Sequence, residues 1–250
     1  MWSQIFADPG VLGICAVLAS MPIIAYMWFF LKKDPEPKKL VIRMFMLGCF
    51  SVIPLGLMQY LFSVYTDFDV YSLIRAHIPH TGLMWITMYL FIGFTEEYLK
   101  HLAVVIGVGT SRKFRRVVDG IEFSIIAALG FSFIEHIVYL ISIYNRGGWD
   151  GLIVPFIFRS ILTTLAHACF SGIYGYYYGK AHFMKSGLDR NKTVARGLIS
   201  AMLLHGAFNT FLEYNIVWAI VPLLMVELSF ILYELKLKRN KLVHQGRDEG

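Results

Sequence analysis

Seven long apolar segments with few charges determine what this chain can fold into. Windows of about 19 residues place them at 10–31, 41–64, 82–109, 118–144, 152–180, 194–213 and 215–236. Each has the length that a helix needs to cross a bilayer. The chain is 57% hydrophobic and only 16% charged, whereas soluble domains have about 45–50% and about 25%. We therefore expect an all-α protein, a polytopic membrane bundle of seven transmembrane helices in a single integral-membrane domain over residues 1–250.

The three cysteines and the basic residues exclude several other classes. Cys15, Cys49 and Cys169 lie inside apolar segments without a C-x-x-C pair, which argues against disulfides and thiolate zinc sites. The net charge of +6 is divided among the connections between segments rather than collected in one patch. We expect contact with anionic lipid headgroups and no binding of nucleic acid.

The distribution of Lys and Arg predicts the orientation of the chain. Basic residues gather after the first, third, fifth and seventh segments, whereas the alternate connections contain only Arg75 and Arg146. The positive-inside rule then places the N-terminus outside and the C-terminus in the cytoplasm. Compact connections favour a prokaryotic plasma membrane as the location of this multi-pass protein.

The third segment carries three ionisable residues near its middle. Glu96, Glu97 and Lys100 would each cost roughly 2.5–3.5 kcal/mol at the centre of a bilayer. Glu96 and Lys100 are four residues apart on one helical face, and Glu97 is turned by about 100°. One lysine cannot neutralise two glutamates, so the surplus carboxylate must bind a proton or a cation.

Three further segments contain polar residues at a similar depth. The fourth has Glu135 followed by His136, the fifth has His167, and the sixth has His205 and Asn209 one turn apart. Each residue alone also has a structural explanation, because intramembrane histidines form hydrogen bonds between helices and Glu135 could pair with Arg159. Together they predict a polar layer shared by four neighbouring helices.

At these residues the chain resembles the PrsW family of intramembrane proteases, which is related to the CAAX prenyl endopeptidase and Abi group. The resemblance extends from residue 33 to the sixth segment and rests on five motifs in order: Glu96-Glu97-x-x-Lys100, Asp119-Gly120-Ile121, Glu135-x-Ile137-x-Tyr139, Arg159 with His167, and Leu204-His205-Gly206. Two positions depart from the family pattern. His136 replaces the usual Asn, and Asn209 replaces a frequent Asp that would be a better metal ligand.

The resemblance implies hydrolysis of a peptide bond in a membrane-protein substrate, of the anti-sigma-factor type that controls a stress response. The depth of the polar residues favours cleavage near the extracytoplasmic side. The residues expected to carry the reaction are Glu96, Glu97, Lys100, Glu135, His167, His205 and Asn209.

Two mechanisms stay open at this point. In one, a divalent metal, with zinc expected, is held by His167, His205 and Glu97, and another glutamate is the general base. In the other, no metal takes part: a glutamate activates water directly, and His167, His205 and Asn209 donate hydrogen bonds to the oxyanion.

Two other functions compete with proteolysis. A seven-span lipid amidase also has intramembrane histidines and acids, but that group is expected to have a histidine pair on its last span, and 215–236 contains no histidine. A proton-coupled transporter or a non-enzymatic scaffold could use the same buried acids and bases as a relay. Transporters often contain inverted repeats with broken helices, and the sequence shows no internal repeat.

Overall fold

The computed structural model describes residues 8–31, 37–66, 82–108 and 114–248, and every regular element in these ranges is helical. The elements are α2 (Pro9–Leu31), α3 (Lys38–Thr66), α5 (Gly82–Val108), α6 (Val117–Gly147), α7 (Ile153–Phe158), the π-helical turn η1 (Arg159–Thr163), α8 (Thr164–His182), α9 (Gly187–Glu213) and α10 (Val217–Asp248). Because α7, η1 and α8 form one continuous helix, the described residues contain seven long helices. The all-α prediction is confirmed for them.

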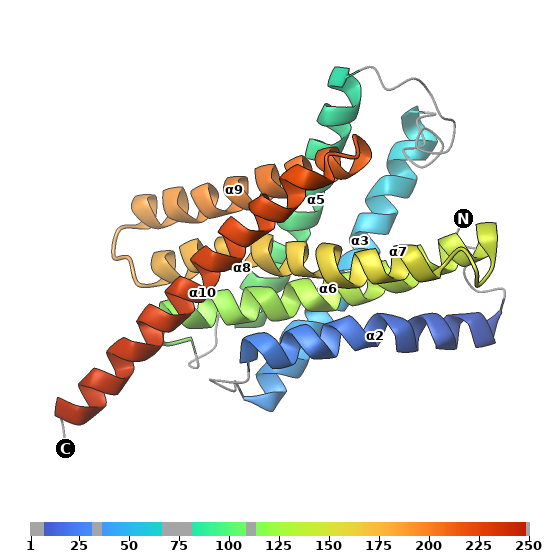
Figure 1. Cartoon of the computed structure of the whole chain (residues 1–250). Coiled ribbons are helices and arrows are strands. Elements are labelled where there is room, and N and C mark those ends of the chain that lie inside the picture. The colour runs from blue at the N-terminus through green and yellow to red at the C-terminus, as the bar shows by residue number, and fades with distance from the viewer. Residues whose placement is uncertain (1–7, 32–36, 67–81, 109–113, 249–250) are drawn as a thin grey trace.

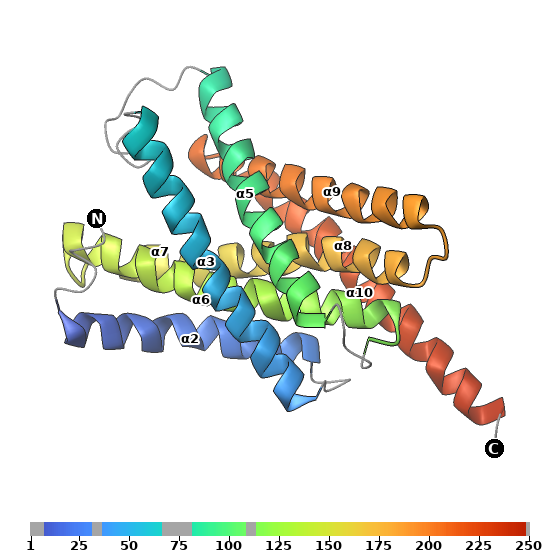
Figure 2. The same ribbon diagram turned by 180° about the vertical axis from the view of Figure 1, so that it is seen from behind.

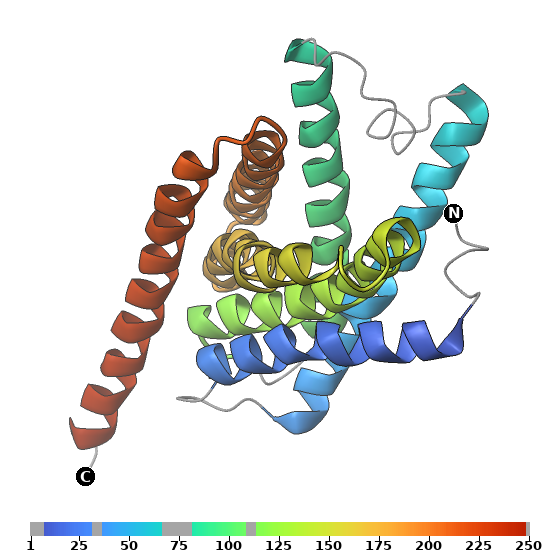
Figure 3. The ribbon, with the colours of Figure 1, turned by 45° about the vertical axis from the view of Figure 1, so that its right-hand side comes forward.

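The helices form three layers. The helices α2, α6, α8 and α9 run side by side in a central layer (Figure 1). From behind, α3 and α5 cross one face of this layer (Figure 2), and α10 crosses the other, as the rotated view also shows (Figure 3). The polar segment on α5 is thereby pressed against α6, α8 and α9.

Small residues let the layers approach closely around α6, whose residues from Val118 to Ser132 are all buried. The backbone of α6 at Gly130 touches α3 near Phe45, and Gly120 on α6 touches Gly175 on α8. Close backbone contact of this kind is typical of helix packing in membranes, where van der Waals packing replaces much of the hydrophobic effect.

The helix boundaries agree with the predicted segments except at two ends. Helix α9 begins at Gly187, before the predicted 194, because the side chain of Ser186 caps it by accepting the backbone N–H of Asp189. Helix α10 continues past 236 to Asp248.

Among the described residues, five helices are long and apolar enough to cross a membrane: Pro9–Leu31, Lys38–Met58, Val117–Gly147, Ile153–His182 and Val217–Lys236. The other two long helices of the described ranges, α5 and α9, carry five of the seven residues predicted to form the site: Glu96, Glu97, Lys100, His205 and Asn209. The total of seven spans and the orientation of the termini stay predictions.

Candidate active site

Four helices bring most of the predicted residues to one place. Helix α5 supplies Glu96, Glu97 and Lys100, α8 supplies His167, and α9 supplies His205, and these five residues are each at most 5% exposed. Glu135 of α6 stands at the edge of the group, with 26% of its side chain exposed. The polar face of α5 therefore points inward, and the side chains that are costly in lipid satisfy one another.

Glu97 lies at the centre of the network. Its Oε1 accepts hydrogen bonds from Lys100 Nζ at 2.7 Å and from His205 Nδ1 at 2.9 Å, and its Oε2 accepts one from Ser171 at 3.1 Å. These contacts hold Glu97 in a single position and leave it little freedom to bind a substrate. Glu97 thus joins Lys100, His205 and Ser171 in one hydrogen-bonded group.

Lys100 bridges three members of the site. Besides Glu97, its Nζ is 3.8 Å from Glu96 and 2.9 Å from His167 Nδ1, and it lies 4.3 Å above the ring of Phe131. Because a lysine ammonium can only donate, His167 Nδ1 is the acceptor, and the hydrogen of the ring is on Nε2. One buried ammonium thus fixes the tautomer of a histidine on another helix.

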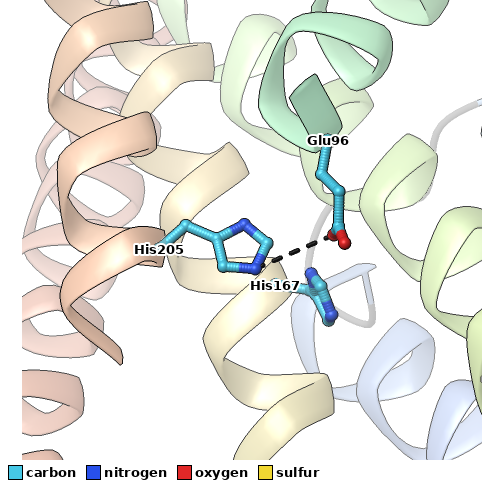
Figure 4. Close-up of side chains that lie close together, drawn as sticks. All are labelled: Glu96, His167 and His205. Carbon is cyan, nitrogen blue, oxygen red and sulfur yellow. Dashed lines mark ion pairs between the residues drawn. The ribbon is translucent and has the colours of Figure 1, made fainter. Parts of the chain in front are cut away.

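Glu96 differs from Glu97 in having an oxygen without a hydrogen bond. Its Oε2 is buried and has no hydrogen-bond partner among the described residues, although His205 Nε2 is only 3.7 Å away (Figure 4). Since Glu97 accepts the Nδ1–H of His205, the Nε2 of that ring carries a lone pair. A lone pair and a carboxylate oxygen that face each other suit a proton or a cation between them.

Glu135 links the site to Arg159. Its Oε2 accepts the Nε2–H of His167 at 2.9 Å and lies 3.1 Å from Nη2 of Arg159. The Glu135–Arg159 pair considered as a structural explanation is therefore present. It occurs together with the histidine contact and does not replace it.

A cavity of about 500 Å³ opens onto the site. Glu96 and Glu135 form part of its wall, and so does Asn209, one turn beyond His205 on α9. The remaining lining residues come from α5, α6, the α7–η1 helix and the end of α9: Tyr89, Ile92, Tyr139, Val154, Pro155, Phe158, Arg159, Thr163, Leu212 and Glu213. The cavity combines apolar walls with a few polar side chains, as ligand-binding cavities do.

Three residues of the site could hold a metal ion. One ligand atom from each of Glu96, His167 and His205 lies within 4.8 Å of the others. Ligand atoms on one tetrahedral zinc are about 3.3 Å apart, so the ligand atoms of these side chains would have to approach by up to about 1.5 Å. Two histidines and a glutamate are a set of ligands that zinc accepts, and Oε2 of Glu96 has no hydrogen-bond partner among the described residues. Both nitrogens of His167 are already in use, by Lys100 and by Glu135, so zinc would have to displace one of these two contacts. The sequence prediction had Glu97 as the third ligand, whereas Glu96 belongs to this group.

Two further residues lie near the site: Ser171, which sequence reasoning missed, and His136. Ser171 hydrogen-bonds Glu97, and its spacing of four from His167, which puts both on one helical face, could have revealed it. His136 lies between α6 and α8, with Nδ1 near Ser132 at 2.8 Å and Nε2 3.3 Å from Thr164. The departure from the family pattern at His136 thus affects helix packing rather than the group that could hold a metal.

Comparison with known proteins decides the family. The family described as PrsW family intramembrane metalloprotease matches residues 36–233. The chain belongs to this family. The PrsW relatives include Protease PrsW of Bacillus subtilis (strain 168), which is 31% identical over 194 residues, covering 76% of this chain and 79% of the relative. No solved structure matches the chain.

Two further PrsW relatives cover more of the chain. Protease PrsW of Oceanobacillus iheyensis is 29% identical over 219 residues, or 86% of this chain and 91% of that one. Protease PrsW of Clostridioides difficile (strain 630) is 28% identical over 226 residues, or 89% and 88%. The chain is therefore a PrsW family intramembrane protease, as its motifs predicted. The wider relation to CAAX prenyl endopeptidases stays a prediction.

Proposed function

We propose that this protease hydrolyses a peptide bond of a membrane-protein substrate inside the cavity, at Glu96, His167 and His205. One observation carries the proposal: these side chains converge within 4.8 Å, and Glu96, which lines the cavity, has a buried oxygen without a hydrogen-bond partner among the described residues. A buried polar atom that lacks a partner is costly. A bound cation, or the water molecule that attacks the peptide bond, would remove that cost.

Each residue of the network has a proposed task. Glu97 would hold His205 in place. Glu96 and the two histidines would hold one zinc ion, for which His167 would give up its contact with Lys100 or with Glu135. When bound, zinc would polarise the scissile carbonyl as a Lewis acid. Glu135, a cavity-lining carboxylate in contact with His167, is placed to accept a proton from the attacking water. Asn209, also in the cavity wall, is placed to hydrogen-bond the oxyanion.

The position of the cavity supports cleavage near the extracytoplasmic side. It is lined by the first half of α5, the second half of α6, the start of α7 and the end of α9. In the seven-span arrangement with the N-terminus outside, these helix ends adjoin the connections poor in Lys and Arg. We infer that a substrate enters as an unwound juxtamembrane segment, and that it is a membrane protein of the anti-sigma-factor type.

Replacement of Glu96 tests the proposed reaction. Glu96→Gln should lower cleavage of a co-expressed single-span membrane substrate by about 10²–10⁴-fold, because the carboxylate can then neither bind a metal nor take a proton. The matched control is Glu227→Gln on α10. Glu227 is also buried and also lacks a hydrogen-bond partner among the described residues, but it does not line the cavity. Equal activity of the two variants would exclude the proposed site.

Metal analysis tests the ligand set. The purified protein should contain about one zinc per chain, and His167→Ala and His205→Ala should each abolish this content. A chelator should stop cleavage, and added zinc should restore it. If the protein binds no metal and cleaves in the presence of the chelator, the zinc proposal is wrong. Glu96 would then be the base, with the histidines as hydrogen-bond donors.

A further inference from the structure

The helix from Ile153 to His182 contains one π-helical turn beside the site. In η1 the backbone N–H of Thr164 donates to the carbonyl of Arg159, five residues earlier, and the Thr164 hydroxyl lies 3.2 Å from the same oxygen. Single π-helical turns inside α-helices are rare and occur frequently at functional sites. The turn lies between Arg159 and His167 and changes how these two side chains are related.

The π-helical turn places Arg159 and His167 on one face of their helix. In an unbroken α-helix, residues eight apart point about 80° away from each other. The extra residue of a π-helical turn removes about 100° of rotation, so the two point within about 20° of each other. Both side chains accordingly reach the same oxygen of Glu135, at 2.9 Å from His167 and 3.1 Å from Arg159.

Two residues of the same turn lie in the cavity wall and carry polar atoms that have no hydrogen-bond partner among the described residues. Arg159 and Thr163 both line it, and Nε of Arg159 and Oγ1 of Thr163 are buried without a hydrogen-bond partner among the described residues. The Cζ of Arg159 lies 3.8 Å from the centre of the Tyr139 ring. Its Nη2 contacts Glu135, but the remaining donors of the guanidinium exceed what this ion pair can use.

We propose that Arg159 and Thr163 form a subsite that binds main-chain carbonyl groups of the substrate next to the scissile bond. The proposal rests on the proposed proteolysis. A segment unwound for cleavage loses its helical hydrogen bonds, and in a bilayer its carbonyls find no water to replace them. Arg159 and Thr163 supply donors at that position.

The charges of the cavity favour a neutral ligand over an acidic side chain. Three carboxylates line the cavity, those of Glu96, Glu135 and Glu213, against the single guanidinium of Arg159. A further carboxylate from the substrate would be repelled by this surplus, whereas a peptide carbonyl is an uncharged acceptor. The subsite therefore recognises the peptide backbone rather than an acidic side chain.

Binding to the inactive Glu96→Gln protein tests this without turnover. The probe is a labelled synthetic single-span peptide with a Leu/Ala span and a juxtamembrane segment of Gly, Ser and Thr. A second probe carries Asp in that segment. The Asp probe should bind more weakly than the uncharged probe, because the carboxylates that line the cavity repel its side chain. Arg159→Lys, introduced in addition to Glu96→Gln, keeps the positive charge beside Glu135 but loses the planar set of guanidinium donors. It should weaken binding of both probes about tenfold. Thr163→Val in the same background should weaken binding about threefold.

The matched control is Arg146→Lys, a change at an exposed arginine whose side chain bonds Ser142 at the end of α6. It should bind both probes like the parent. In the active enzyme, Arg159→Lys should raise KM about tenfold and leave kcat nearly unchanged. The free energy of unfolding of Arg159→Lys should equal that of the wild type, and this measurement distinguishes a lost substrate contact from a misfolded protein.

Three results would overturn the subsite. In the first, Arg159→Lys binds both probes as tightly as its parent, so that the residue only supports Glu135. In the second, binding of the Asp probe alone is weakened, so that the ligand is an acidic side chain. In the third, the uncharged probe does not bind at all. An active Glu96→Gln enzyme would instead refute the proposed catalytic role of Glu96 and leave the binding result standing.

Discussion

Replacing Lys100 by Met removes the positive charge at the centre of the site and should strongly destabilise the fold. Lys100 is 2% exposed, and its ammonium is 2.7 Å from Glu97 and 3.8 Å from Glu96. After the change, two buried carboxylates have lost their shared ammonium. Breaking a buried ion pair by removing one partner costs about 3–5 kcal/mol, so we expect the free energy of unfolding to fall by that amount.

Equilibrium unfolding in mixed micelles with increasing SDS measures this loss. The control is Lys180→Met, because Lys180 is exposed and surface substitutions usually change stability by about 0.5 kcal/mol or less. The double variant Glu97→Gln/Lys100→Met should recover most of the stability, since it removes both charges and keeps the hydrogen-bonding shape of the side chain at 97. A Lys100→Met protein as stable as the control would refute the proposed charge balance.

Two further changes test the packing and the orientation of the ligands. Gly130→Ala should lower the free energy of unfolding by about 1–3 kcal/mol in the same assay, because the new Cβ would overlap the backbone carbonyl of Phe45. The control is Gly13→Ala, which has open space around the new Cβ. Equal stability of the two variants would contradict the close contact of α3 and α6. Glu97→Gln should lower the affinity for zinc about 10–100-fold in a competition titration, because an amide holds the Nδ1–H of His205 less firmly than a carboxylate does. An unchanged affinity would show that Glu97 does not orient His205.

The amino-acid sequence alone determined the class of fold and the region of the site. Apolar segments of bilayer length predict the helices, because a lipid-exposed backbone has to satisfy its hydrogen bonds within the segment. Ionisable residues are costly in lipid, so Glu96, Glu97 and Lys100 had to face the protein interior. His167 and His205, at similar depth on other segments, were the groups available to meet them.

The different tasks of the two adjacent glutamates depend on tertiary structure. Their chemistry is identical, and the spacing on α5 allows Lys100 to reach either one. Only the packing of α8 and α9 gives Glu97 its contacts with Ser171 and His205. The same packing leaves one oxygen of Glu96 without a hydrogen-bond partner in the part of the chain that the structure describes.

The π-helical turn is a second feature that the sequence did not predict. The hydrophobic pattern predicts a helix over 152–180, but one extra residue in a single turn changes that pattern too little to be detected. The folded chain uses the turn to bring Arg159 and His167 to one oxygen of Glu135. The cost of burying charge thus lets the sequence indicate which residues form the site and at what depth. The direction of each side chain depends on contacts between helices that are distant in sequence.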